Sequence, residues 1–343
     1  MYDLIIVTHI PAFYKVNLYN ELAKEKNILI IFIASNTNEK RSGDFITLEK
    51  SQFEYITLHS GDIQDRNLIL NLKKLKAILK ECEYRKIIVG GWDLPEYWYI
   101  SFSFPKLRNC LILESTINES RIGILRGPVK KLFLTRISTV YASGFLQKKL
   151  LDALKYEGVV KITRGVGIIN KPIVNNINKQ YKKNYLYIGR LSKEKNIEML
   201  IDIFNNLEDY KLTIIGTGPL ENDLKTNANK NIIFEGEIIN QNLREYFENH
   251  DVLLLASSSE TWGLVIEEAL YFGVPVIISS NCGACEIIKE GVNGYIVCTA
   301  SKTNIRHAIL TVNEESYQKL LDGVRKFSIE KKDLEQLRVY FAN

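Results

Sequence analysis

The chain alternates short apolar runs with longer amphipathic segments, a pattern typical of βα units wound around parallel sheets. Strands buried on both faces of such a sheet are apolar along most of their length. In the first half the predicted strands are Leu4–Val7, Ile28–Ala34, Lys86–Val89, Cys110–Leu113 and Thr139–Tyr141. The helices predicted between them include Lys15–Lys26 and Leu68–Lys80.

The second half repeats this rhythm. Its predicted strands are Tyr185–Ile188, Leu212–Ile215, Ile232–Phe234, Val252–Leu255, Val276–Ile278 and Tyr295–Val297. Its predicted helices lie near Asn196–Asn206, Leu243–Asn249, Leu264–Phe272 and Cys285–Glu290. The tail, Glu315–Phe341, is predicted to form two helices with a break near Phe327–Ile329. The fold class expected from this order is α/β, with parallel sheets.

The polar segment Asn170–Asn184 marks the predicted boundary between two domains, because it is rich in asparagine and carries Pro172 near its start. A chain of 343 residues is long enough for two cores. We predict one Rossmann-like domain over residues 1–169, a second over 170–326, and a helix over 327–343 that crosses back to the first. The two sheets are expected to face a central cleft, where ligands bind at the carboxyl ends of the strands.

Composition argues against several other classes of protein. The formal net charge of +5 gives no reason to expect nucleic-acid binding. The longest apolar run, Ile28–Ala34, is far shorter than the roughly 20 residues of a membrane-spanning helix. Asp3 follows Met1 and Tyr2 directly, so the first residues do not read as a signal peptide. Five irregularly spaced cysteines do not form a disulfide framework, and a cytoplasmic location is expected.

The strongest local signal is a pair of glutamates, Glu260 and Glu268, with seven residues between them. Glu260 lies in the loop after a predicted strand, and Glu268 lies early in the next predicted helix, so both side chains are expected at one site. Gly263 lets the backbone approach a ligand at the start of that helix, where free N–H groups favour an anion. Carboxylates beside an anion site suit a hydroxyl-rich, phosphorylated ligand.

Two further glycine turns follow predicted strands. Gly189 is followed by Arg190, and Lys195 comes five residues later, so two cations stand where a strand passes into a helix. Cations at such a junction suit a diphosphate. The second turn holds Gly216 and Gly218 and is followed by Pro219. It does not predict a dinucleotide site, because Glu221 occupies the position of the third glycine in that motif.

These motifs, taken in order, resemble the donor domain of the retaining family 4 glycosyltransferases, which have the GT-B fold. The matching segments are Gly189-Arg190-Leu191 with Lys195-Asn196, Gly216-Thr217-Gly218-Pro219, Phe234-Glu235-Gly236, Glu260 with Trp262-Gly263 and Glu268, and Glu286-Ile287-Ile288 with Gly291-Val292-Asn293-Gly294. In the first half, the stretch from Thr8 to Ala23 resembles the opening of several bacterial members. The likeness is to enzymes that build cell-surface polysaccharides.

The resemblance implies that Glu268 holds the donor ribose, that Arg190 and Lys195 hold the diphosphate, and that Glu260 contacts the donor sugar. It also implies that the donor site includes Gly189, Gly216, Gly218, Glu237, Thr261, Trp262, Gly263 and Leu264. The implied reaction moves a hexose from a nucleotide-diphosphate sugar, with UDP as the commonest carrier, and retains the anomeric configuration. No cofactor is expected. No metal is expected either, since the chain lacks an Asp-x-Asp pair that would hold a metal on the diphosphate.

The acceptor is expected to be a glycan or a lipid-linked glycan of the cell envelope, bound by the first domain. His9, Lys15, Asp93 and Glu114 are the candidate acceptor-side residues, since they stand in or follow loops after predicted strands. Many family members carry a histidine after a middle strand, whereas the comparable stretch here, from Leu113 to Thr116, has none. Two alternatives stay open: an inactive GT-B module that only binds nucleotide sugars, and an epimerase that acts on the nucleotide sugar itself.

Some features have a plainer explanation. Glu267, beside Glu268, reads as an ordinary exposed helix residue. The lone Cys-x2-Cys pair, Cys282 and Cys285, has no second pair or nearby histidine and does not predict zinc. From Arg121 to Lys149 basic and apolar residues alternate without a carboxylate. This basic stretch reads either as a solvated helix face or, as we favour, as a surface that docks on anionic lipid at the inner face of the cell membrane.

Overall fold

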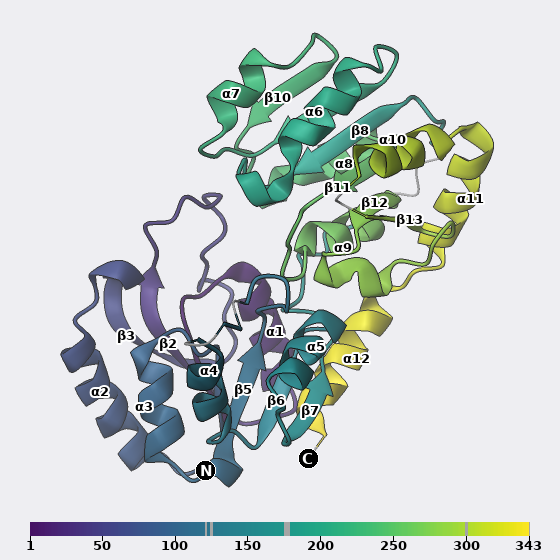
Figure 1. The fold of residues 1–343 in the computed structure, drawn as a ribbon. Helices are drawn as coiled ribbons and strands as arrows, with labels where there is room; N and C mark the ends of the chain where they lie inside the picture. The colour runs from purple at the N-terminus through teal and green to yellow at the C-terminus, as the bar shows by residue number, and fades with distance from the viewer. Residues whose placement is uncertain (121, 124–125, 175–178, 299–300, 343) are drawn as a thin grey trace. The chain divides into compact units, whose positions relative to one another are not determined.

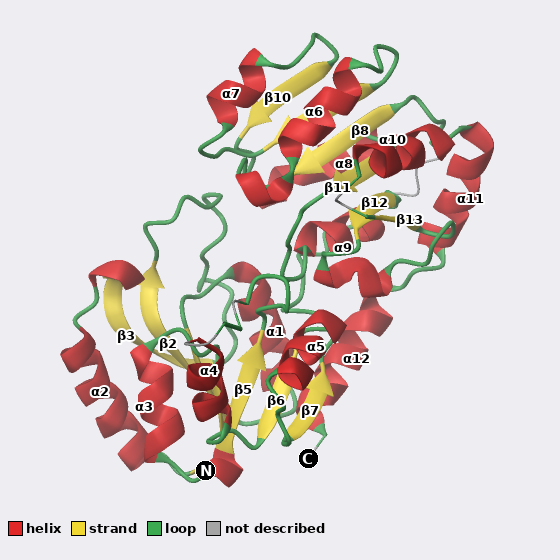
Figure 2. Ribbon diagram, viewed as in Figure 1, coloured by secondary structure: helices red, strands yellow, loops and turns green. Residues whose placement is uncertain are grey.

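The computed structural model describes residues 1–120, 122–123, 126–174, 179–298 and 301–342. The chain divides into two compact units (Figure 1). The first comprises Met1–Ile168 together with Asp333–Asn343, and the second comprises Ile169–Lys332. Each unit is a parallel sheet with helices packed on it, as Figure 2 shows by colour. The expectation of two Rossmann-like α/β domains is therefore confirmed.

The first unit is built on a seven-stranded parallel sheet with the order β3-β2-β1-β4-β5-β6-β7. This is the doubly wound order, in which the chain reverses direction across the sheet after β3. Its strands are β1 Tyr2–Thr8, β2 Ile28–Asn36, β3 Glu54–Asp62, β4 Tyr84–Val89, β5 Asn109–Leu113, β6 Thr139–Ala142 and β7 Val159–Ile162. Its helices are α1 Phe13–Ala23, α2 Leu68–Glu81, α3 Pro95–Ser103, α4 Arg126–Leu134 and α5 Phe145–Ala153.

Alternate residues of these strands build two cores, one on each face of the sheet. On one face Ile5 and Val7 of β1 belong to the core that includes buried residues of α2, α3, α4 and α5. On the other face Leu4 and Ile6 belong to the core that includes α1 and the end of α12, Ile329–Phe341. The period of two along β1 therefore explains why helices cover both faces.

The second unit is built on a six-stranded parallel sheet with the order β10-β9-β8-β11-β12-β13, which is again the doubly wound order. Its strands are β8 Asn184–Ile188, β9 Lys211–Ile215, β10 Ile232–Gly236, β11 Val252–Leu255, β12 Val276–Ser279 and β13 Gly294–Val297. Its helices are α6 Ile197–Asn205, α7 Glu221–Thr226, α8 Leu243–Asn249, α9 Leu264–Tyr271, α10 Lys302–Thr311, α11 Glu314–Arg325 and the start of α12.

All strands predicted from the sequence are present, and two more strands appear at the edges of the first sheet. β3 carries polar residues along its length and is largely accessible, and β7 has only four residues, so neither shows the apolar run of a central strand. One predicted helix is wrong: around Cys285 the chain forms only a short 3₁₀ turn, Gly283–Ile287. No helix among the described residues is long and apolar enough to span a membrane.

The last helix, α12, contributes to the core of the first unit. Tyr340 is only 5% exposed and stacks on Tyr141 of β6, with ring centroids 4.8 Å apart and an angle of 12° between the rings. Leu337 is buried in the same core. The start of α12, up to Lys332, belongs to the second unit.

We expect Tyr340→Ala to lower the free energy of unfolding by about 3–5 kcal/mol, because it removes a buried aromatic side chain and leaves a cavity. Urea unfolding of the full chain measures this change. Leu334→Ala is the matched control, since Leu334 is 47% exposed on the same helix and its loss should cost little. Equal effects of the two substitutions would contradict the packing of Tyr340 described above.

Candidate active site

Three loops that follow neighbouring strands of the second unit are joined to one another by hydrogen bonds. The side chain of Asn196, after β8, donates to the carbonyl of Ala256, after β11, over 2.9 Å. The N–H of Ser258 donates to the carbonyl of Glu194 over 2.7 Å, and the N–H of Leu191 donates to that of Thr217, after β9, over 2.9 Å. The segments that carry the predicted motifs therefore form one rigid surface at the carboxyl ends of β8, β9 and β11.

Glycines make this close packing possible. A Cβ atom at position 216 would lie 2.0 Å from the carbonyl oxygen of Gly189, and one at position 218 would lie 2.4 Å from that of Leu191. Gly263 has a φ of +94° immediately before α9, a conformation that favours glycine. It turns the chain so that the first N–H groups of α9, which lack partners within the helix, start beside Glu260.

Lys195 and Glu260 form an ion pair within this surface. Lys195 follows β8 and Glu260 follows β11. The pairing of their loops therefore brings the residue predicted to hold the diphosphate into contact with the residue predicted to hold the donor sugar. Arg190 stands on the same β8 loop and is exposed, and no carboxylate of the described chain lies within ion-pair distance of it. The surface thus presents Arg190 as an exposed cation and Lys195 as a cation held by a carboxylate.

Glu268 is mostly buried, and a neighbouring amide fixes one of its oxygens. The Nδ2 atom of Asn240 donates to Oε1 of Glu268 over 2.7 Å. The Oδ1 atom of Asn240 in turn accepts from the side chain of Asn170 over 2.9 Å. Asn240 was not predicted from the sequence, because it lies 28 residues before Glu268 and belongs to no motif.

The prediction for Glu267 is wrong, since this side chain is completely buried. Its Oε1 accepts from the indole Nε1 of Trp262 over 2.6 Å, and its Oε2 lies 2.8 Å from Nζ of Lys332. Trp262 and Lys332 are 1% and 5% exposed. The indole N–H is therefore hydrogen-bonded within this buried network, and Trp262 supports the loop between Glu260 and α9 from the interior of the unit.

The other predicted donor-side residues lie around the same loops. Thr261 and Leu264 flank Trp262 and Gly263 and are partly exposed, and Glu237 is exposed directly after β10. Cys282 is buried and its Sγ contacts the carbonyl oxygen of Trp262 at 2.8 Å. Within the described part of the chain, no three His, Cys, Asp or Glu side chains are grouped in a way that could hold a metal ion.

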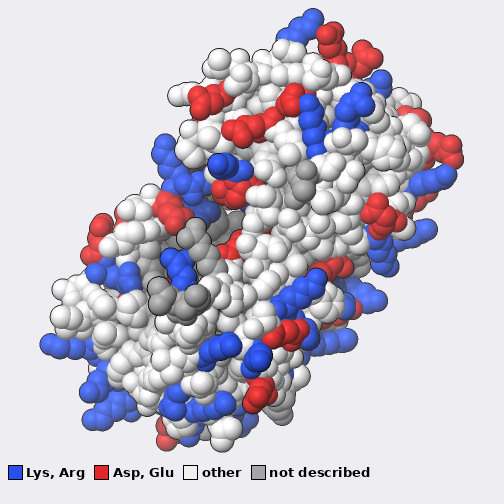
Figure 3. All heavy atoms as spheres, in the orientation of Figure 1, with Lys and Arg blue, Asp and Glu red and all other residues white. Residues whose placement is uncertain are grey.

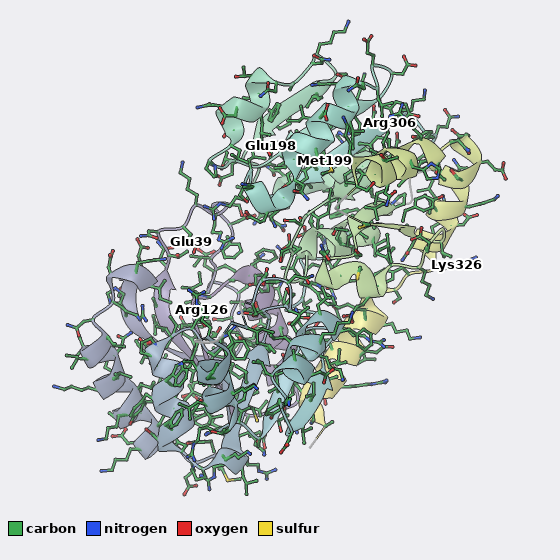
Figure 4. The ribbon with its side chains drawn as sticks, viewed as in Figure 1. Glu39, Arg126, Glu198, Met199, Arg306 and Lys326 are labelled. Carbon is green, nitrogen blue, oxygen red and sulfur yellow. The ribbon has the colours of Figure 1, made fainter. Side chains whose placement is uncertain are left out.

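In the first unit, the four predicted acceptor-side residues line one cavity of about 400 Å³ at the carboxyl ends of β1, β4 and β5. Nε2 of His9 lies 2.7 Å from Asp93, and Nδ1 lies 3.0 Å from the hydroxyl of Tyr97. Lys15 and Glu114 form an ion pair of 2.9 Å. The cavity is also lined by Tyr14, Phe45 and Glu39, the last of which is labelled in Figure 4 on the loop between β2 and β3.

Charge pairing governs protonation in this cavity. Burial disfavours the ammonium of Lys15, but Glu114 together with Tyr14 and Tyr19 outweighs burial and raises the pKa of Lys15 well above its usual range. Burial also favours the neutral form of Asp93, yet the hydrogen bond and charge of His9, a backbone hydrogen bond and the charge of Lys15 together prevail and lower the pKa of Asp93. The cavity therefore offers charged, preorganised hydrogen-bonding groups beside aromatic rings.

The basic stretch from Arg121 to Lys149 is divided in the structure. Arg121, Ile124 and Leu125 lie outside the described residues, and the remainder runs through α4, β6 and α5. On α5, Lys148 is paired with Asp152 at 2.9 Å. On α4, Val129 and Leu132 are each 52% exposed beside the exposed Arg126 and Lys131. Exposed apolar residues therefore stand beside cations on α4, and on α5 Phe145 is 49% exposed on the helix that also carries the exposed Lys149.

Comparison with known proteins gives a family match over the second unit: residues 170–327 match the family model described as glycosyl transferases group 1. An uncharacterized 41.2 kDa protein in the cps region of Klebsiella pneumoniae is 30% identical over 73% of this chain and 67% of its own length. The O-antigen biosynthesis glycosyltransferase WbnH of Escherichia coli is 32% identical over 66% of this chain and 67% of its own length.

Among solved structures, Anabaena HepE in complex with UDP-glucose is similar, with a TM-score of 0.71. The likeness covers 99% of this chain and 100% of that one at 13% identity, so it bears on the fold alone.

We expect Lys332→Met to lower the free energy of unfolding by about 3–5 kcal/mol, because it leaves the carboxylate of Glu267 buried without its cation. Urea unfolding measures the change, with Lys331→Met as the matched control, since Lys331 is the exposed neighbour on α12. The double variant Glu267→Leu, Lys332→Met should recover part of the loss, because it removes both charges. A Lys332→Met variant as stable as the control would refute the buried pair.

Proposed function

This chain belongs to the group 1 glycosyl transferases, and on that premise we propose that it moves a hexose from a UDP-sugar to a glycan or lipid-linked glycan. Retention of the anomeric configuration is carried over from the family resemblance. The observation that carries the proposal is the set of three connected loops in the second unit, which carry Arg190, Lys195 and Glu260 and pair Lys195 with Glu260 next to the start of α9.

This arrangement suits the charges that develop during transfer. As the anomeric C–O bond breaks, positive charge grows on the sugar and negative charge grows on the leaving diphosphate. Arg190, Lys195 and the first N–H groups of α9 are the groups proposed to stabilise that diphosphate. When the donor binds, Lys195 exchanges part of its contact with Glu260 for the phosphate oxygens, and Glu260 becomes available to the sugar hydroxyls.

The buried carboxylate of Glu268 suits the ribose of the donor nucleotide. Asn240 donates to Oε1 of Glu268 and so holds the carboxylate in one orientation, and a carboxylate held in this way is a suitable acceptor for the hydroxyl groups of a ribose. Asn240 is therefore proposed as a positioning residue for the nucleotide. UDP as the carrier is carried over from the family resemblance.

The cavity of the first unit is proposed as the acceptor site. Sugars are bound through hydroxyl groups and through the apolar faces of their rings, and the cavity lined by Asp93, Glu114 and Lys15 with Tyr14 and Phe45 supplies both kinds of contact. Both ring nitrogens of His9 already have partners, so His9 is proposed to orient Asp93 rather than to touch the acceptor itself.

Biosynthesis of a cell-envelope polysaccharide is the proposed setting. The relatives named for the Klebsiella cps region and for O-antigen biosynthesis in E. coli support it. Such a setting places the enzyme in the cytoplasm, at the inner face of the membrane that holds lipid-linked acceptors. The surface of α4 is proposed to dock there. Figure 3 shows Lys and Arg spheres set among uncharged ones on the visible face of the first unit.

We expect Arg190→Ala to lower kcat by about 10²-fold, because the missing cation stabilises the leaving diphosphate more in the transition state than in the ground state. Steady-state kinetics with a panel of UDP-, GDP- and ADP-sugars measures this and identifies the donor. Lys193→Ala is the matched control, since Lys193 is exposed on the same loop. A normal kcat in Arg190→Ala would remove it from the leaving-group site. Donor binding without turnover in the wild type would favour an inactive scaffold.

Transfer should not require a divalent metal, because the proposed cations and helix N–H groups take over the role of the ion. Turnover is measured in excess EDTA and again after addition of Mg²⁺ or Mn²⁺, and equal rates are expected. Activity that disappears in EDTA and returns with the metal would overturn this part of the proposal.

Liposomes that contain anionic lipid should bind the enzyme at low salt and release it at high salt, because the proposed attraction is electrostatic. Lys131→Gln should weaken sedimentation with these liposomes by roughly fivefold, which corresponds to about 1 kcal/mol per cation at the surface. Lys148→Gln is the control, since Lys148 is already paired with Asp152. Binding that ignores salt, or equal effects of the two variants, would exclude α4 as the docking surface.

A further inference from the structure

A second cavity of the first unit, of about 350 Å³, lies at the amino ends of the strands, at the edge of the sheet opposite the proposed acceptor site. It is lined by the starts of β1, β4, β5, β6 and β7 and by the end of α12. We call it the amino-end cavity. Figure 1 shows both ends of the chain at this side of the unit. Its residues take no part in the function proposed above.

Two lysines of this cavity stand where the strand pattern calls for apolar residues. Lys86 lies beside Leu4 in the register of β4 with β1, and Lys161 lies beside Tyr141 in the register of β7 with β6. Leu4 and Tyr141 both belong to the buried core on that face of the sheet. Since neighbours in a parallel register point to the same face, both lysines lie on the face of the sheet that α1 and the end of α12 cover.

Neither lysine has a carboxylate partner among the described residues. Nζ of Lys86 donates to the carbonyl of Leu107 over 2.6 Å, and Nζ of Lys161 donates to the carbonyl of Ala342 over 2.5 Å. Burial and the nearby charge of Lys86 lower the pKa of Lys161, although the Cys110 thiol between the two partly offsets this. Both cations thus line this cavity without a carboxylate partner among the described residues that would stabilise them.

The charge of the whole lining is also unbalanced. Lys26 and Arg85 line the cavity besides the two lysines, and Asp3 is the single carboxylate in its described lining. Asp3 is already engaged, since one oxygen lies 3.6 Å from Arg85 and the other accepts from the backbone N–H of Asn27. The deeper wall is apolar and aromatic, with Tyr141 stacked on Tyr340.

We propose that the amino-end cavity binds a phosphoryl group, with Lys86 and Lys161 as its cationic hydrogen-bond donors and the aromatic wall against the organic part of the ligand. Lysine is a common phosphate-binding residue, and a phosphate needs several such donors at once. The cavity has the size of sites for small ligands. The ligand is either a soluble phosphate ester or the headgroup of an anionic phospholipid, which share this chemistry.

Binding is tested on the full chain in an Arg190→Ala, Lys131→Gln background, which weakens phosphate binding at the proposed donor site and vesicle binding at the proposed α4 surface. One arm titrates inorganic phosphate and glycerol 3-phosphate by calorimetry. The other arm sediments the protein with phosphatidylcholine vesicles with and without phosphatidic acid. Lys86→Gln and Lys161→Gln should each weaken binding about tenfold or more, since each removes one charge-assisted hydrogen bond. Lys76→Gln, at an exposed site on α2, is the control and should bind normally.

Saturable binding of soluble phosphate that is lost in both variants would support the proposal with a soluble ligand. Binding only to vesicles that contain phosphatidic acid, again lost in both, would support it with a lipid. The proposal is overturned if the parent protein binds in neither arm, or if both variants bind like the control. Without phosphate, each variant should melt at or above the temperature of the parent, because it relieves repulsion between the lysines. A lower melting temperature of both would assign the lysines a structural role instead.

Discussion

Parallel pairing of the strands is the constraint on which both candidate sites depend. In a parallel sheet every strand ends at the same edge, so the sheet alone brings together loops that are distant in sequence. In the second unit this brings Lys195 after β8 onto Glu260 after β11. In the first unit it gathers His9 after β1, Asp93 after β4 and Glu114 after β5 around one cavity. The apolar strands thus determine where the polar residues of both candidate sites lie.

Both sites are held ready by pairs of opposite charge. Lys195 with Glu260 and Lys15 with Glu114 each bring two ionised groups out of water, and each partner offsets the cost of burying the other. A ligand that carries both phosphate and hydroxyl groups can replace such a partner without leaving a charge uncompensated. The same pairing keeps the loops in one conformation before the ligand arrives, which lowers the entropy cost of binding.

Elements and residues whose structure depends on the local sequence pattern could be predicted. Residues whose position depends on a partner far away in the sequence could not. Central strands such as β8 and β11 are largely buried and rich in apolar residues and were predicted closely, whereas the edge strands β3 and β7 lack that signal. The motif residues Lys195 and Glu260 were found by their spacing. Glu267 was misread because its partner, Lys332, lies 65 residues away, and Asn240 was missed because nothing near it hints at Glu268.

Helix α12 has a consequence for the order in which the protein is completed during synthesis. A ribosome releases domains from the N-terminus onward, and each usually folds as it emerges. Here the core of the first unit includes Leu337 and Tyr340, which are translated after the whole of the second unit. The part made first must therefore wait, with the groove beside β6 and α1 uncovered, until the last helix emerges. Nascent chains of this protein would be exposed to chaperones and misassembly at that groove while the whole second unit is translated.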